Sequence, residues 1–178
     1  MTGWTKRREI MKKNVNHIIA GFIIFCLLAT GNVTAAMKDV KPSKACNYLA
    51  SIGLSTRGWK NYYDDVYGCT SPYKEFGSGY PLKNNLAYYV EGTATTVRQL
   101  KLVVNVNNRD EEKKAHVELL KATEVLVKKS LNESLPDSTY KAITNGKNIS
   151  SQIGDATIEV LRENWPTGKG YGIKVIIK

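Results

Sequence analysis

Histidine is nearly absent from this chain, and its scarcity limits the chemistry that the chain can perform. Of the 178 residues only His17 and His116 are histidines, and His17 lies in an N-terminal leader that we expect to be removed. His116 falls inside the apolar stripe of a predicted helix, where a histidine is more often a buried residue with a hydrogen-bond partner. A Ser-His-Asp hydrolase needs a base that faces an open cleft, and a zinc site needs several ligands. We therefore assign no catalytic residue, metal ligand or cofactor.

Cysteine is also scarce. The chain has three cysteines, and removal of the leader takes away Cys26 and leaves Cys46 and Cys69. Two cysteines in an oxidising compartment are typical of one disulfide bond, which would stabilise the fold by roughly 3 kcal/mol through the loop that it closes. The alternative is a metal or redox pair, but the chain has no Cys-x-x-Cys spacing and no histidine near either cysteine.

No apolar run is long enough to span a bilayer, which takes about 20 residues. The run at residues 18–28 follows a basic segment and precedes small residues that end at Ala35. This layout is typical of a secretory signal peptide, so we predict a signal peptide over 1–35 and a single periplasmic or secreted domain over 36–178, with no stable membrane span after cleavage. An uncleaved anchor and a twin-arginine signal are weaker alternatives, and Met11 is an alternative start.

Acidic residues are too few to balance the basic ones. Removal of residues 1–35 takes away five of the 26 basic and one of the 16 acidic side chains, which lowers the formal charge from +10 to +6. Such an excess favours an acidic protein or an anionic envelope component as partner, and the simpler alternative is that the charge only keeps the protein soluble. Nucleic acid is disfavoured as a partner outside the cytoplasm.

Two adjacent segments carry the clearest periodicity. From Leu100 to Val106 every second residue is apolar, as in a strand with one buried face. From Arg109 to Leu131 apolar residues recur at helical spacing. Ser43 is expected to cap the first helix and Asn108 or Asp110 the long one. The expected elements are a helix over 43–52, strands over 86–92 and 96–106, helices over 109–131 and 136–143, and strands over 149–153, 156–163 and 171–178.

This order of elements predicts an α+β domain. We expect an antiparallel sheet of about five strands, two plus three, packed against the long amphipathic helix. An N-terminal helix and a disulfide-tethered loop over 54–81 complete the predicted fold. A loop of that length inside a compact domain is often functional.

The predicted loop is rich in aromatic residues, a composition that is typical of recognition surfaces when the rings carry a polar group. The simpler alternative is that the rings pack on the sheet in place of regular secondary structure. The candidate binding residues are Trp59, Tyr62, Tyr63, Asp64, Asp65, Tyr67 and Tyr73, with Tyr80 in the same loop.

Two further sets of charged residues are candidates for function. Lys114, Lys121 and Lys128 recur every seven residues and would form a basic ridge along the long helix, although a solvated helix face with interleaved glutamates gives the same pattern. Asp64 or Asp65 with Glu75 could supply the two carboxylates of a glycosidase, but the sequence does not set the distance between them.

Together these patterns favour a small exported, non-enzymatic binding protein. Its aromatic loop would contact a protein partner, as in an inhibitor, an immunity-type protein or an envelope accessory factor. The alternatives are a small hydrolase that acts on cell-envelope polymers through the loop carboxylates, and a binder of anionic surfaces through the basic ridge. The sequence leaves the partner and the oligomeric state open.

Overall fold

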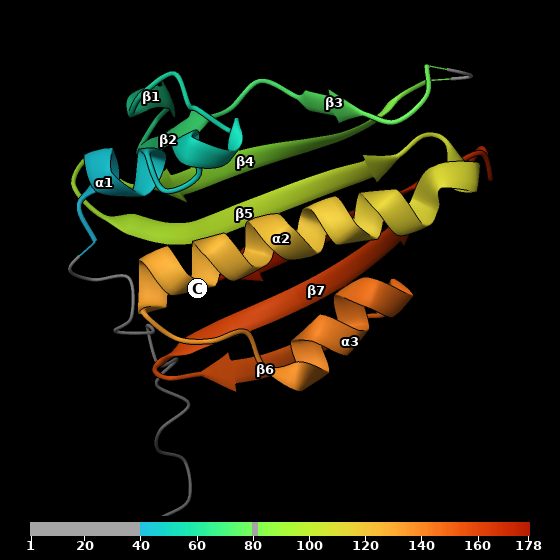
Figure 1. Cartoon of the computed structure of the whole chain (residues 1–178). Coiled ribbons are helices and arrows are strands. Elements are labelled where there is room, and N and C mark those ends of the chain that lie inside the picture. Colours follow the sequence, from blue (N-terminus) through green and yellow to red (C-terminus); the bar gives the residue numbers. More distant parts are fainter. Residues whose placement is uncertain (1–39, 80–81) are drawn as a thin grey trace, which may run out of the picture. The chain divides into compact units, whose positions relative to one another are not determined.

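The computed structural model describes residues 40–79 and 82–178, which form an α+β fold (Figure 1). The helices are α1 (Pro42–Cys46), η2 (Ala50–Ile52), η3 (Arg109–Glu111), α2 (Glu112–Leu131) and α3 (Asp137–Asn145), η2 and η3 being 3₁₀ helices. The strands are β1 (Lys60–Tyr63), β2 (Val66–Thr70), β3 (Lys74–Phe76), β4 (Asn84–Gly92), β5 (Val97–Val106), β6 (Ile149–Ile153), β7 (Ala156–Asn164) and β8 (Tyr171–Ile177). The predicted signal peptide and Tyr80 lie outside the described residues. Within these residues, no helix is both long and apolar enough to cross a membrane.

The strands form one open antiparallel sheet of eight strands, not of about five as the sequence predicted. The order is β1-β2-β4-β5-β8-β7-β6, and β3 pairs with β4 beyond the end of β2. The additional strands β1, β2 and β3 come from the segment predicted as a loop. They are three to five residues long, which is too short for an alternating pattern to be recognised, and pairing with β4 rather than local sequence holds β2 and β3 in place.

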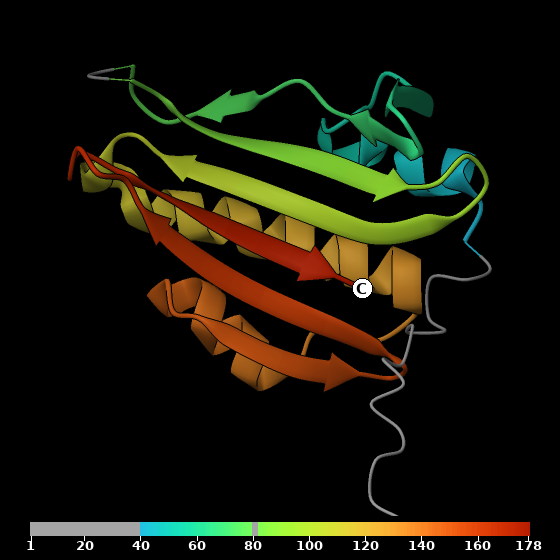
Figure 2. The ribbon, with the colours of Figure 1, turned by 180° about the vertical axis from the view of Figure 1, so that it is seen from behind.

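All the helices lie on one face of the sheet, as Figure 2 shows from behind. In β5, Leu100, Leu102 and Val104 are fully buried on this face, whereas the alternate residues Lys101 and Val103 are only half-buried on the other. Burial of one apolar face against an amphipathic helix drives this arrangement. The opposite face carries no helix from the described residues.

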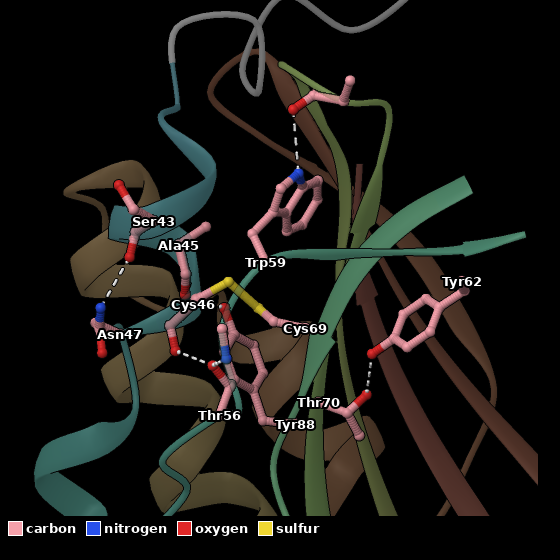
Figure 3. The surroundings of a disulfide bond; sticks show 12 residues. Ser43, Ala45, Cys46, Asn47, Thr56, Trp59, Tyr62, Cys69, Thr70 and Tyr88 are labelled. Carbon is pink, nitrogen blue, oxygen red and sulfur yellow. Dashed lines mark hydrogen bonds between the residues drawn. A yellow bond between two sulfur atoms is a disulfide. The ribbon is translucent and has the colours of Figure 1, made fainter. Parts of the chain in front are cut away.

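The N-terminal helix is held to the sheet by a disulfide bond between Cys46 in α1 and Cys69 in β2, as predicted (Figure 3). Their Cα atoms lie 6.0 Å apart. Next to the bond, the buried Tyr88 hydroxyl donates to the main-chain oxygen of Ala45 at 2.9 Å. Burial raises the pKa of Tyr88, so the phenol remains a neutral donor. One covalent link and one buried hydrogen bond therefore fix α1 over β2 and β4.

The ends of the helices agree with the sequence in part. Ser43 does not cap the first helix, because Pro42 occupies its first turn and Lys41 the cap position, and that helix ends at Cys46 rather than continuing to Ile52. Pro42 favours this start because its missing N–H is not needed there. The side chain of Asn108 accepts from the N–H of Asp110 and caps η3, which leads into α2. The predicted cap therefore acts on this 3₁₀ helix, whereas α2 itself begins after Glu111 without a side-chain cap.

We predict that replacing both bridging cysteines with alanine lowers the free energy of unfolding by roughly 3 kcal/mol, because the unfolded chain regains the entropy of the open loop. Urea denaturation of the Cys46→Ala/Cys69→Ala variant and of the untreated protein measures the difference. The reduced wild-type protein should unfold at the same urea concentration as the variant. Equal stability of all three forms would contradict a stabilising bridge.

The loop between β3 and β4 is tied to the start of the long helix by Glu111. Its carboxylate accepts a hydrogen bond from the N–H of Ser78 at 2.5 Å. This bond is the main reason that the pKa of Glu111 lies below its usual value of 4.5, with a smaller contribution from Lys114. The ionised form is therefore favoured in the folded state.

A group with a lowered pKa in the folded state stabilises the fold above its unfolded pKa and loses that effect as the pH falls. We predict that Glu111→Gln weakens the decline in stability below pH 4.5, since the neutral amide cannot titrate. Urea unfolding measured at several acidic pH values tests this. Glu124→Gln, at an exposed position of α2, is the matched control and should keep the wild-type pH profile.

Candidate binding pocket at the edge of the sheet

A pocket of about 360 Å³ lies beside β1, β2 and β4. Tyr89 and Thr70, which are paired across β4 and β2, contribute to its wall. Tyr88 and Val90, the neighbours of Tyr89, are buried under the helices, so alternation along β4 directs Tyr89 to the opposite face. The pocket therefore opens on the sheet face without a helix. Its lining residues are Arg57, Lys60, Tyr62, Thr70, Ser71, Pro72, Tyr73 and Tyr89.

One wall of the pocket is Tyr62 in β1. Its hydroxyl lies 3.0 Å from Oγ1 of Thr70, and Figure 3 shows the ring with this hydroxyl directed toward Thr70. The ring lies against Gly68, where an added Cβ would approach its Cε2 atom to 2.8 Å. A residue with a side chain at Gly68 would displace the ring, so glycine is required for this wall.

A second wall is formed by the residues between the end of β2 and the start of β3. Ser71 stays paired with Tyr88, because its N–H donates to the Tyr88 carbonyl at 2.9 Å and its hydroxyl accepts from the Tyr88 N–H at 3.0 Å. Pro72 follows and has no N–H to continue the ladder. Tyr73 is then 58% exposed at the mouth of the pocket. Tyr73 therefore follows a break in the strand pairing, and its side chain is exposed at the pocket.

The lining residues include two cations, Arg57 and Lys60, and no carboxylate. The ammonium group of Lys60 lies 5.4 Å from the centre of the Tyr62 ring. Lys101, on the neighbouring strand, lies 5.1 Å from the centre of the Tyr89 ring and pairs with Glu91. Cations over aromatic faces are favourable, and here they leave the pocket with a net positive lining.

Tyr89 is held in its neutral form by its surroundings. Burial raises the pKa of Tyr89 to about 12, and a side-chain hydrogen bond with Tyr73 adds to the effect. At neutral pH the Tyr89 phenol therefore keeps its proton. The hydroxyl groups of Tyr73 and Tyr89 are possible hydrogen-bond donors for an oxygen atom of a ligand.

The structure brings together only part of the predicted aromatic set. Tyr62 and Tyr73 line the pocket. Trp59 is half-buried against the core, and its Nε1–H donates to the carbonyl of Ala94 at 3.2 Å, which fits the packing alternative. Tyr63 is 64% exposed, and Tyr67 is half-buried in β2; neither lines the pocket.

The pocket also contains residues that the sequence analysis missed, above all Arg57, Lys60 and Tyr89. Tyr89 had a detectable signal, because Leu86, Tyr88 and Val90 share the buried face of β4 and alternation places Tyr89 on the other. Arg57 had no comparable sequence signal, because its position depends on how the chain between η2 and β1 runs past β2.

The candidate glycosidase carboxylates are not brought together. Asp64 and Asp65 form the turn before β2, near the pair Tyr67–Gly92, whereas Glu75 pairs with Asn85. Seven residues of β4 separate these positions, or about 24 Å at the rise of an antiparallel strand. Glycosidase carboxylates lie no more than about 9.5 Å apart. Glu75 instead forms an ion pair with Lys83 at 3.4 Å.

The predicted basic ridge is exposed along α2 but partly neutralised. Lys121 forms an ion pair with Glu118 at 3.3 Å, and Lys128 donates to the carbonyl of Asn132. Lys114 is exposed near the carboxylate of Glu111. These contacts resemble a solvated helix face more than a continuous cationic surface.

His116 is buried, as predicted, and both ring nitrogens have partners. Nδ1 lies 2.9 Å from the carbonyl of Thr144, and Nε2 lies 2.9 Å from the hydroxyl of Tyr171. That hydroxyl donates in turn to Glu112 at 3.0 Å. The histidine thus belongs to a polar network that joins α2, α3 and β8. Over residues 40–79 and 82–178, no group of three or more His, Cys, Asp and Glu side chains is placed to hold a metal ion.

Comparison with known protein families assigns the chain to one of them. Residues 37–167 match the model of a family of unknown function, DUF6030. The chain belongs to this family. The matched range includes every residue that lines the pocket. Searches of curated proteins and of solved structures find no match.

We predict that Tyr73→Phe lowers the pKa of Tyr89, because the variant lacks the hydroxyl that bonds to it. The value should stay above 10, since burial is the larger cause. Titration of protein labelled with carbon-13 at the hydroxyl-bearing ring carbon of tyrosine, followed by NMR, resolves the residue. Tyr63→Phe is the control and should leave the Tyr89 titration unchanged. The same Tyr89 titration in Tyr73→Phe and wild type would show that the two rings do not interact.

Proposed function

We propose that this protein is a non-enzymatic binding module that holds an acidic segment of a partner protein in the pocket beside β1, β2 and β4. The observation that carries the proposal is the lining of the pocket, which combines three tyrosines with two cations and no carboxylate. Tyrosine and arginine are the residues that most often dominate binding energy at protein interfaces.

The charge of the pocket supports an acidic partner. Arg57 and Lys60 are exposed, and neither is in an ion pair within the described part of the chain. A carboxylate that enters the pocket would meet two cations without competition from a lining acid. Arginine can hold a carboxylate through two parallel hydrogen bonds, and the hydroxyl groups of Tyr73 and Tyr89 supply further donors.

The size of the pocket supports a segment of a protein rather than a whole folded surface. Small-ligand sites usually measure about 300–1,000 Å³, and a pocket of about 360 Å³ is near the lower limit. It can accept one or two side chains of a partner. The exposed rings of Tyr62 and Tyr73 can then pack against the apolar part of those side chains while the cations bind the charged ends.

Selection from a library of random displayed peptides tests this proposal. We expect the selected peptides to be rich in Asp and Glu. Their affinity should fall at least about tenfold on Tyr73→Ala and on Arg57→Gln, as for residues at the centre of an interface.

Two exposed tyrosines outside the pocket serve as matched controls. Tyr63→Ala and Tyr140→Ala should keep the wild-type affinity, which separates the pocket from exposed tyrosines in general. Selected peptides without an acidic preference would overturn the proposal. Peptides that bind wild type, Tyr73→Ala and Arg57→Gln equally would do so as well.

A further inference from the structure

The strands β1 and β6, at the two ends of the strand order, differ in how well they are protected against pairing with another chain. At one edge, β1 has four residues, carries Lys60 and shows a register shift between Asn61 and Tyr63. Short length, charge and bulges are the usual ways to block an edge. At the other edge, β6 (Ile149–Ile153) has five residues, no charge, no proline and an unbroken register with β7.

The unpaired backbone groups of β6 can be located from its hairpin. Gly154, at φ 57°, and Asp155 form a two-residue turn closed by Ile153 and Ala156. The closing pair of such a hairpin exchanges both hydrogen bonds, and bonded pairs alternate along the ladder. Ile149, Ser151 and Ile153 therefore bond to β7, whereas Ser150 and Gln152 direct their N–H and carbonyl groups outward. Among the residues with described positions, no other segment forms a backbone hydrogen bond to these two residues.

We propose that β6 pairs with β6 of a second copy of this chain, antiparallel, about a two-fold axis at Ser151. In this register Ser150 lies opposite Gln152 of the partner subunit. The outward-directed groups of both residues then form complete hydrogen-bonded pairs. The two-fold symmetry uses the same edge twice, as in most homodimers.

Charge selects this register over its neighbours. Lys147 lies two residues before β6, and Asp155 lies in the turn that follows it, four residues before and after Ser151. In this register the two side chains therefore come near each other at both ends of the paired strands. Both are exposed, and neither forms an ion pair within residues 40–79 and 82–178. Moving the axis to Ser150 would place Lys147 opposite Ile153, and moving it to Gln152 would place Lys147 beyond the turn, where the chain has already entered β7. Only the register at Ser151 gives two Lys–Asp pairs.

The dimer has a consequence for the proposed binding module, and this step alone rests on that proposal. Because the two-fold axis is perpendicular to the sheet, the helix-free faces of the two copies lie on the same side of the dimer. The pocket of each copy adjoins β1, at the edge opposite β6, so the two pockets lie at the far ends of one continuous sheet. A partner with a repeated acidic segment could engage both and gain avidity without any new contact.

Charge exchange tests the dimer directly by sedimentation equilibrium of the full chain over a range of concentrations. Wild type should dimerise. Lys147→Asp and Asp155→Lys should each raise the dissociation constant about tenfold or more, because each places like charges opposite one another twice. The double variant Lys147→Asp/Asp155→Lys should restore the wild-type constant, since the pairs are rebuilt with reversed sign.

Lys169→Asp, an exposed lysine before β8, is the control for net charge and should leave the constant unchanged. Urea denaturation of each variant confirms that it is folded. A wild type that remains monomeric at every concentration would overturn the dimer, and so would a double variant as weak as the single ones. Peptide binding to the pocket of a single chain does not depend on this edge, so failure of the dimer leaves the proposed function untouched.

Discussion

The burial of one sheet face under a single long helix is the constraint on which the rest of this structure depends. The strands β4, β5, β7 and β8 each direct every second side chain toward the helices, and α2 covers the centre of that face (Figure 1). Because side chains alternate strictly along a strand, the residues between them are committed to the other face. The uncovered face, and any site on it, therefore follows from the packing of the core.

Tyr88 connects this core to the binding pocket. Its side chain points to the buried face and bonds to Ala45 in α1, while its backbone carbonyl and N–H both bond to Ser71. The same residue thus holds the disulfide-linked helix on one face and the break between β2 and β3 at the edge. Pro72 and Tyr73 follow that break, so the shape of the pocket depends on interactions beneath it. The disulfide stabilises this region from the helix side, close to the residues that form the pocket wall.

Periodicity located the long elements well because their burial is one-sided. The predicted strands over 86–92, 96–106, 149–153, 156–163 and 171–178 match β4 to β8 closely. The predicted helix over 109–131 matches η3 together with α2, and the one over 136–143 matches α3. The same reasoning failed over residues 54–81. The strands there are short, and Gly68 and Cys69 are buried by contacts with Tyr62 and Cys46, which are features of the tertiary structure. The candidate site was predicted in part, since Tyr62 and Tyr73 line the pocket but Arg57, Lys60 and Tyr89 were not recognised.

The sequence by itself determined the α+β class, the pairing of Cys46 with Cys69 and the buried place of His116. Each of these depends on local periodicity or on the small number of residues of one type. Only the tertiary structure decided that β1, β2 and β3 extend the sheet and that Tyr73 and Tyr89 meet in one pocket. It also separated Asp65 from Glu75. Contacts between residues distant in sequence depend on how strands pair across the sheet, and the pattern within one segment carries no information about its neighbour.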